Sequence, residues 1–401
     1  MKIYKINNYL FGIVFFFTFL GFYSVLLLGI NADMSGFTRQ LTIPMRILID
    51  VSCLSLLLLG FRNRRIYIKW FILFTFIYLT RIFIDINNLE FFYISYSEVV
   101  LYFISFCVIP FISISKIDFS KIHFKKLYNV FLISALLFSS LSTILYSRFI
   151  REVYRLNTNS AGEEVISPLI LSYCSALIIS VSIIYLIFNK TSKLVKSFSI
   201  LAIIMAVIPF FLGASRGGII AVFFPFILLV FCNTSLKNFF KYLLFFIVLI
   251  VGLVYLDDYF ESGLLTRFLS TSEAIETGGS SAHRIDIWKN SLTQFLNYPF
   301  FGDKLNTQGV NYYPHNIYIE VLQSTGIIGF IPFLILLIKG FVVCMTIFKR
   351  HGEYAWIGVF FVQALIQNMF SGALYTAAWF WTSLAMMLSL NIFLNNEKNP
   401  N

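Results

Sequence analysis

The sequence predicts an all-α polytopic integral membrane protein with about 12 transmembrane helices. Hydrophobic residues make up 59% of its 401 residues and the mean hydropathy is +0.83, whereas charged residues make up 12%. A soluble domain carries about twice that fraction of charged residues. Apolar runs of roughly 20 residues, the length that crosses a bilayer as a helix, recur along the chain. These observations exclude a soluble globular protein.

Basic residues set the predicted orientation of the spans. The spans are predicted at 10–30, 43–60, 70–86, 98–115, 128–146, 169–188, 198–214, 218–234, 242–256, 326–348, 354–371 and 374–394. With the N-terminus in the cytoplasm, eighteen Lys and Arg residues fall in cytoplasmic connections and nine in the outer ones. This asymmetry follows the positive-inside rule, and the even number of spans places the C-terminus in the cytoplasm too. The net charge of +11 therefore reflects topology, and we expect membrane lipids rather than nucleic acid as partners.

The chain is predicted to form a single membrane domain over residues 1–401. Its first apolar run is about 21 residues long, whereas a signal-peptide core has roughly 7–15, so we expect this run to remain as a span. The five cysteines all lie in predicted spans and are interpreted as small apolar packing residues. His, Asp and Cys residues show no metal-ligand spacing, so the sequence predicts neither a metal site nor a cofactor.

Two outer connections stand out by their length. Residues 147–168 form a medium loop, and residues 257–316 form a large loop between the ninth and tenth spans. The large loop is aromatic, which is atypical of a disordered segment, and loops of this length are usually functional. Helical spacing predicts an amphipathic helix over 282–297, ended by Pro299, with an apolar face of Ile285, Trp288, Leu292 and Phe295.

An anion site is predicted at the start of this amphipathic helix. Ser280 or Ser281 can cap the helix, which places Arg284 in its first turn. Free backbone N–H groups and a guanidinium together favour an anion. We therefore expect Arg284 to contact a negatively charged ligand.

The stretch "GASRGG" predicts a tight hairpin at the outer face. Arg216 lies midway between Lys196 and Lys237, which mark the cytoplasmic edge, and two spans must fit in that interval. Gly217 and Gly218 allow the backbone to turn and a ligand to approach. A charge so close to the hydrocarbon needs a partner. Snorkelling, or pairing with a loop carboxylate, is an equal alternative for Arg216.

The stretch "PHN" precedes the tenth span. Pro314 can open a helix, and Asn316, Glu320 and Gln323 then share one polar stripe. A polar stripe on the approach to a span predicts a water-filled cavity, with His315 at its mouth. The alternative is a solvated interfacial histidine.

Two i, i+4 charge pairs lie within predicted spans. Arg46 precedes Asp50, and Arg81 precedes Asp85, by four residues. We interpret both as structural pairs, because each can neutralise itself on one helix face without a ligand.

In this order, the motifs resemble the O-antigen ligase/polymerase superfamily. They occur in "FLGASRGGIIAV", "HRIDIWKNSLTQFLNYPFFGDK" and "PHNIYIEVLQSTGIIGFIPF", and they cover about residues 210–335. The matching elements are Ser215-Arg216-Gly217, Arg284 with Trp288, Pro299 with Gly302, His315-Asn316 and Ser324-Thr325-Gly326. The chain departs from the family pattern at Glu320, which precedes the glycine by six residues instead of two.

The resemblance implies a metal-independent glycosyltransferase of the bacterial inner membrane, with its active site facing the periplasm. Such enzymes transfer a glycan from an undecaprenyl diphosphate carrier to a sugar hydroxyl. His315 would then act as general base, Arg216 and Arg284 would stabilise the leaving diphosphate, and the large loop would close over the headgroup. The residues expected to contact substrate are Asn316, Ser215, Gly217, Arg151 and Trp288.

The sequence favours a polymerase, which joins one carrier-linked repeat unit to another. A chain-length-regulating membrane protein is then an expected partner. A ligase, which transfers the finished chain to lipid A–core, is the alternative. A polysaccharide flippase is less favoured, because transporters place their binding residues at the bilayer midplane. A scaffold of an export complex leaves the Arg and His motifs unexplained.

Overall fold

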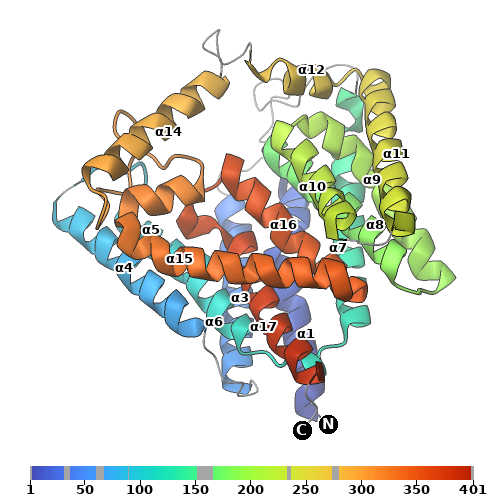
Figure 1. The fold of residues 1–401 in the computed structure, drawn as a ribbon, viewed down its shortest axis with the longest axis horizontal. Helices are drawn as coiled ribbons and strands as arrows, with labels where there is room; N and C mark the ends of the chain where they lie inside the picture. Colours follow the sequence, from blue (N-terminus) through green and yellow to red (C-terminus); the bar gives the residue numbers. More distant parts are fainter. Residues whose placement is uncertain are drawn as a thin grey trace. The chain divides into compact units, whose positions relative to one another are not determined.

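The computed structural model describes residues 2–30, 37–59, 67–88, 90–150, 166–232, 236–272 and 280–398. Within these ranges the secondary structure is helical throughout, which confirms the predicted all-α class (Figure 1). Long apolar segments leave the backbone no partner except itself in a bilayer, and the helix supplies that partner at every residue. The described part divides into two compact units.

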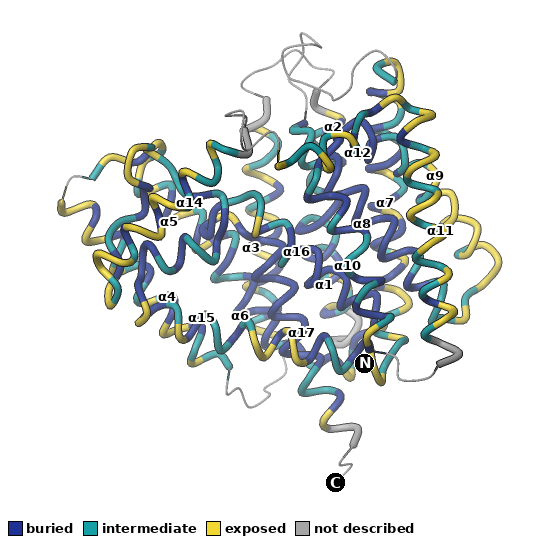
Figure 2. Tube along the Cα trace, turned by 45° about the horizontal axis from the view of Figure 1, so that its top comes forward, coloured by how far each residue is buried: buried dark blue, intermediate teal, exposed yellow. Residues whose placement is uncertain are grey.

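The first unit consists of Met1–Leu59, Ser120–Leu269 and Cys344–Ile366. Its helices are α1 (Lys2–Thr18), α2 (Leu20–Ile30), α3 (Phe37–Leu59), α7 (Phe124–Tyr146), α8 (Pro168–Phe188), α9 (Lys193–Gly213), α10 (Arg216–Cys232), α11 (Leu236–Phe260) and α12 (Leu264–Leu269). It also holds most of α16 (Ala355–Phe370). Figure 2 shows α8 as a largely buried helix and α11 as a largely exposed one. Since α11 is apolar along its length, we expect its exposed side to face lipid.

The core of the first unit is built on aromatic rings. Tyr128 of α7 stacks on Tyr185 of α8 with ring centroids 3.3 Å apart, and Trp356 of α16 meets both rings edge-on at 5.6 and 5.9 Å. The Tyr128 hydroxyl also lies 2.8 Å from the Ser199 hydroxyl of α9. These contacts hold α7, α8, α9 and α16 together.

The second unit consists of Gly60–Phe119, Ser270–Val343 and Gln367–Asn401. Its helices are α4 (Ile68–Asn87), α5 (Tyr96–Tyr102), a π-helical segment (Phe103–Val108), α6 (Ile109–Ser115), α14 (Ser280–Asn297), most of α15 (Ile317–Arg350) and α17 (Ala378–Lys398). Trp381 of α17 is fully buried against Phe71, Phe74, Phe111 and Phe333.

Each of the twelve predicted spans overlaps a helical segment of the structure. By length and composition, nine helices in the described ranges can cross a membrane. The bent pair Ile6–Thr18 and Leu20–Leu28, which turns by 61°, is a tenth candidate. Two predicted spans correspond to the shorter helices α10, with 17 residues, and α16, with 16 residues. The number of crossings and the sidedness of the loops stay predictions, as does the single membrane domain.

Candidate active site

The predicted amphipathic helix is confirmed as α14, but its buried face is not the predicted one. Ile287, Ser291 and Gln294 are buried, whereas Leu292 and Leu296 are exposed. The buried face is chosen by polar contacts to the following loop, which periodicity of apolar residues cannot reveal. The predicted caps Ser280 and Ser281 lie where side chains fall outside the described part of the chain.

Gln294 makes three hydrogen bonds from α14 to the following loop. Its amide nitrogen donates to a carboxylate oxygen of Asp303 at 2.7 Å and to the carbonyl of Asn306 at 3.2 Å. Its amide oxygen accepts from the backbone N–H of Gln308 at 2.7 Å. One side chain thus fixes residues 303–308 against the helix.

The turn from Pro299 to Gly302 inserts into a break in α15. The helix has a non-helical residue at Gly326, with φ 58° and ψ −161°. The N–H groups that this break releases, those of Ile327 and Ile328, donate to the carbonyls of Pro299 at 2.8 Å and Phe300 at 3.2 Å. The broken helix therefore recovers its lost backbone partners from the turn.

Only glycine fits on either side of this junction. A Cβ on Gly302, which has φ +72°, would overlap the backbone of Ser324 and Thr325. A Cβ on Gly326 would overlap the backbone of Phe300. Two family motifs that are separate in sequence, the P-x-x-G turn and the glycine of the tenth span, are thus two halves of one joint.

His315 lies directly before α15, at a strained backbone position. Its φ is +56°, in the left-handed region that non-glycine residues adopt at an energetic cost. Asn316 caps the helix, because its side-chain oxygen accepts from the backbone N–H groups of Tyr318 at 3.1 Å and Ile319 at 3.3 Å. The helix begins at Ile317, so Pro314 does not open it as predicted but precedes its cap.

Trp288 and Arg284 of α14 hold the ends of neighbouring segments. The Trp288 indole N–H donates to the carbonyl of Pro314 at 2.9 Å, next to His315. The Arg284 guanidinium donates to the carbonyl of Phe370, the last residue of α16, at 2.8 Å. A cation is favoured at the C-terminal end of a helix. The R-x-x-x-W motif thereby ties α14 both to the histidine turn and to α16.

The structure brings His315 and Arg284 together in the second unit. Burial, followed by the positive charge of Arg284 and by His283, lowers the pKa of His315 to about 4. The imidazole is therefore neutral near pH 7. Its ring contacts Tyr313 with centroids 4.6 Å apart and Tyr312 at 5.5 Å. No described residue forms a hydrogen bond with either ring nitrogen of His315.

A cluster of tyrosines that the sequence did not predict borders His315. Tyr313 packs against Tyr93 and Tyr375, with ring centroids 5.9 and 6.1 Å apart, and the hydroxyls of Tyr93 and Tyr375 share a hydrogen bond. Burial raises the pKa of all three hydroxyls, so they stay protonated. The members come from three distant segments, and only the adjacent tyrosines in "YYPHN" gave a signal.

The predicted polar stripe of α15 is confirmed as a stripe, but its side chains bind the protein's own backbone. Glu320, 1% exposed, accepts from the N–H of Leu374 at 2.9 Å. Gln323 donates to the carbonyls of Lys304 at 3.0 Å and Leu305 at 3.2 Å. These side chains anchor loops that return to the helix, and the expected water-filled cavity stays a prediction.

Arg216 lies in the first unit, at the predicted hairpin between α9 and α10. Ala214, with φ +37°, makes the turn. The Arg216 Nε donates to the carbonyl of Arg267 in α12 at 2.6 Å, and the Arg267 guanidinium donates to the carbonyl of Ala214 at 3.2 Å. Burial and the charge of Arg216 lower the pKa of Arg267. Each of the two guanidinium groups thus binds a main-chain carbonyl at this hairpin.

The glycines of this hairpin serve helix packing. A Cβ on Gly213 would lie 2.6 Å from the carbonyl of Pro168, and one on Gly218 would overlap the Ser172 side chain of α8. Gly217 is buried in the first turn of α10, and the carbonyl of Ser215 accepts from the N–H of Gly218 at 3.0 Å. Close contact with α8 therefore accounts for Gly213 and Gly218, whereas a ligand contact at Gly217 stays a prediction.

The remaining predictions have mixed outcomes. Arg151 lies outside the described residues, as do most of the medium loop's residues. The Arg81–Asp85 pair is confirmed at 3.5 Å, and Asp85 also accepts from the N–H of Leu305 at 2.9 Å. The Arg46–Asp50 pair stays a prediction. Among the described residues, no cluster of three or more His, Cys, Asp or Glu side chains is able to hold a metal ion.

Comparison with known proteins bears on these elements. Residues 200–334 match a family model described as O-antigen ligase, and this range contains Arg216, Arg284 and His315. A comparison with curated proteins finds no match. The resemblance to the O-antigen ligase/polymerase superfamily that the motifs predicted is therefore confirmed for residues 200–334.

Proposed function

We propose that the protein is a surface-polysaccharide polymerase of the O-antigen type, acting at the periplasmic face of the bacterial inner membrane. It transfers a glycan from undecaprenyl diphosphate to the terminal sugar hydroxyl of another carrier-linked repeat unit. The observation that carries the proposal is the neutral imidazole of His315 beside the Arg284 guanidinium, with neither ring nitrogen hydrogen-bonded to a described residue.

The reaction needs one proton acceptor and one anion stabiliser. The acceptor hydroxyl oxygen forms a bond to the anomeric carbon, and the bond from that carbon to the diphosphate oxygen breaks. The diphosphate leaves with the electron pair, and His315 takes the hydroxyl proton. Arg284 stabilises the charge that develops on the diphosphate, and the same role for Arg216 rests on the motif resemblance alone. General base catalysis of this kind contributes roughly 10²–10⁴ in rate.

Substrate binding would strengthen His315 as a base. In the free protein the charge of Arg284 contributes to the low pKa of His315. A diphosphate beside Arg284 offsets that charge and raises the pKa towards the ordinary value of about 6.5. The imidazole is then a better proton acceptor only when a donor is bound.

An O-antigen ligase is the second candidate, and the description of the matching family model favours it. The two activities use the same donor and the same chemistry. They differ in the acceptor, which is a carrier-linked repeat unit for the polymerase and lipid A–core for the ligase.

Surface polysaccharide from a strain that lacks the native gene tests the proposal. Arg216→Ala, Arg284→Ala and His315→Ala are expressed separately, with Lys289→Ala as a matched control, because Lys289 is exposed on the same helix as Arg284. Membrane levels of each variant are measured in parallel.

We expect the control to give normal ladders and the three variants to leave lipid A–core bearing a single repeat unit. Bare core, with long chains accumulating on the carrier, would make the protein a ligase. Normal ladders from all three variants at normal membrane levels would refute the catalytic assignment.

A further inference from the structure

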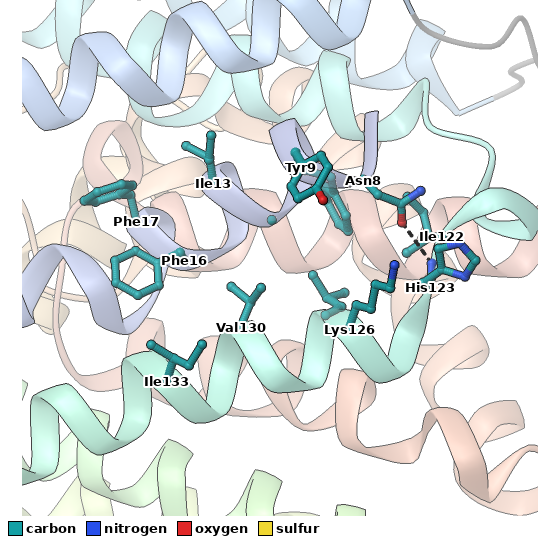
Figure 3. A pocket seen from close by; sticks show the side chains of 13 residues that line it. Asn8, Tyr9, Ile13, Phe16, Phe17, Ile122, His123, Lys126, Val130 and Ile133 are labelled. Carbon is teal, nitrogen blue, oxygen red and sulfur yellow. Dashed lines mark hydrogen bonds between the residues drawn. The ribbon is translucent and has the colours of Figure 1, made fainter. Parts of the chain in front are cut away.

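The first unit contains a cavity of about 580 Å³ between α1 and α7 (Figure 3). Its volume is that of a small-ligand site, for which roughly 300–1,000 Å³ is typical. None of the residues proposed for glycan transfer lines it. The proposed transfer chemistry therefore does not account for this cavity.

One end of the cavity is entirely apolar. Phe16 and Phe17 of α1 face Val130 and Ile133 of α7 across it. Ile133 is 56% exposed, so the wall continues onto the outer surface of the unit. An apolar slot that opens along two membrane helices fits a hydrocarbon chain.

The other end is polar and basic. His123 and Lys126 are exposed at this end, beside Asn8 and Tyr9 (Figure 3). Asn8 links the two walls, because its side chain donates to the carbonyl of Lys121 at 2.9 Å and accepts from the N–H of His123 at 2.9 Å. The opening is thus preformed by hydrogen bonds, and the Lys126 ammonium is exposed beside it.

Charge indicates which lipid fits. Residues 116–126 hold four lysines and one acidic residue, Asp118. The positive-inside pattern places this segment at the cytoplasmic surface, where anionic headgroups attract basic residues. A basic opening above an apolar slot matches a phosphate that carries an acyl chain.

We propose that this groove binds an anionic phospholipid of the cytoplasmic leaflet. The acyl chain lies between α1 and α7, and the phosphate contacts Lys126 and His123. The lipid joins two helices that are far apart from one another in sequence. This inference is independent of the proposed glycan transfer.

Native mass spectrometry of the purified full-length protein tests the headgroup contact. The protein is equilibrated with equimolar phosphatidylglycerol and phosphatidylethanolamine of identical acyl chains. We expect wild type to retain phosphatidylglycerol, and Lys126→Ala to retain about fivefold less of it, the effect of one lysine near an anionic surface. Lys125→Ala is the matched control, because Lys125 is exposed in the same turn and does not line the cavity.

A second variant tests the slot. Gly12 lines the cavity, and a Cβ there would lie 3.6 Å from Val130, an ordinary contact. Gly12→Leu should therefore fold normally, fill the slot and abolish lipid retention, with thermal unfolding as the check on folding.

Four results would overturn the proposal. They are equal retention of both lipids by wild type, equal effects of the Lys126 and Lys125 substitutions, full retention by a folded Gly12→Leu protein, and displacement of phosphatidylglycerol by equimolar undecaprenyl phosphate. The last result would assign the groove to the carrier lipid.

Discussion

Arg216 in the first unit and Arg284 in the second form the same kind of hydrogen bond to the backbone. Each guanidinium donates to a main-chain carbonyl near the C-terminal end of another helix. Arg216 reaches Arg267 in α12 at 2.6 Å, and Arg284 reaches Phe370 in α16 at 2.8 Å. Such a bond satisfies a terminal carbonyl and holds the planar guanidinium in one orientation, with other N–H groups directed elsewhere.

The two arginines differ in their neighbours. Arg216 lies beside a second guanidinium, that of Arg267, whose pKa it helps to lower. Arg284 lies beside His315, whose pKa it helps to lower to about 4. Two adjacent cations favour an anion between them, whereas a cation beside a neutral imidazole combines an anion contact with a proton acceptor. If the proposed function holds, we expect the first region to bind charge and the second also to move a proton.

Replacing the base should have the largest effect. Asparagine tolerates the left-handed backbone of His315 but cannot accept the proton. We expect His315→Asn to lower the rate of glycan transfer in proteoliposomes by roughly 10²–10⁴ and to leave thermal unfolding above about pH 7 unchanged. A rate within about tenfold of wild type would remove His315 from the chemistry.

Replacing Arg216 distinguishes charge binding from hairpin structure. We expect Arg216→Ala to lower the rate by roughly 10²–10³, and Arg216→Lys to recover part of it, because lysine keeps the charge and loses the planar fork. Thermal unfolding of the Lys variant is the control. If both variants lose stability in proportion to activity, Arg216 serves the hairpin alone.

The joint between the P-x-x-G turn and α15 should be sensitive to a single methyl group. Gly326→Ala adds an overlap with backbone to a positive φ, so we expect a destabilisation of roughly 3 kcal/mol or more, and loss of transfer activity. Gly309→Ala is the matched control. Gly309 also has positive φ, but its Cβ would lie 3.6 Å from the Asn290 side chain, and we expect about 1–2 kcal/mol. Equal losses of stability in Gly326→Ala and Gly309→Ala would show that the positive φ, and not the overlap with the Phe300 backbone, causes the effect.

The pH dependence of transfer should report the contact between Arg284 and His315. In the free protein His315 has a pKa of about 4 and is neutral above that pH, so kcat/KM, which reports the free enzyme, should fall only as pH decreases through about 4. Arg284→Gln removes a positive charge and raises the pKa of His315, so the rate should fall at a higher pH. Arg267→Gln, in the first unit, should not change the pH at which the rate falls. If the rate of Arg284→Gln falls at the same pH as that of wild type, the charge of Arg284 does not affect the pKa of His315.

The low pKa of His315 should also make the free energy of unfolding depend on pH. The unfolded histidine, with a pKa of about 6.5, binds a proton more readily than the folded one. His315 therefore reduces the free energy of unfolding as pH falls from about 6.5 to about 4. His315→Asn should weaken this pH dependence, as measured by thermal unfolding.

The smallest effect is expected at the surface ion pair of the second unit. Lys304 and Glu90 lie 3.0 Å apart, with both side chains partly exposed. We expect Lys304→Ala to change stability by about 0–1 kcal/mol and to leave activity unchanged, because the backbone of Lys304 and Leu305 stays anchored by Gln323. A marked loss of transfer activity in Lys304→Ala would show that the Lys304 side chain takes part in the proposed active site.

The sequence alone predicted those features of the fold that depend on short segments of the chain. The helical class, the position of α14 and the hairpin at Arg216 were all predictable, because hydrophobic runs, apolar spacing and the distance between Lys196 and Lys237 act within short segments. The buried face of α14 was not predictable in this way. Gln294 and Ser291 turn inwards because residues 303–308 return to meet them.

By itself, the sequence determined which segments form helices and which positions hold ionisable side chains, since both follow from the composition of short windows. The tertiary structure alone decided which of those residues meet. It placed Tyr93 and Tyr375 beside Tyr313, fitted the Pro299–Gly302 turn into the break at Gly326, and set His315 next to Arg284. These contacts depend on segments separated by tens to hundreds of residues. Their geometry is fixed by packing and backbone hydrogen bonding across the fold, which no local pattern encodes.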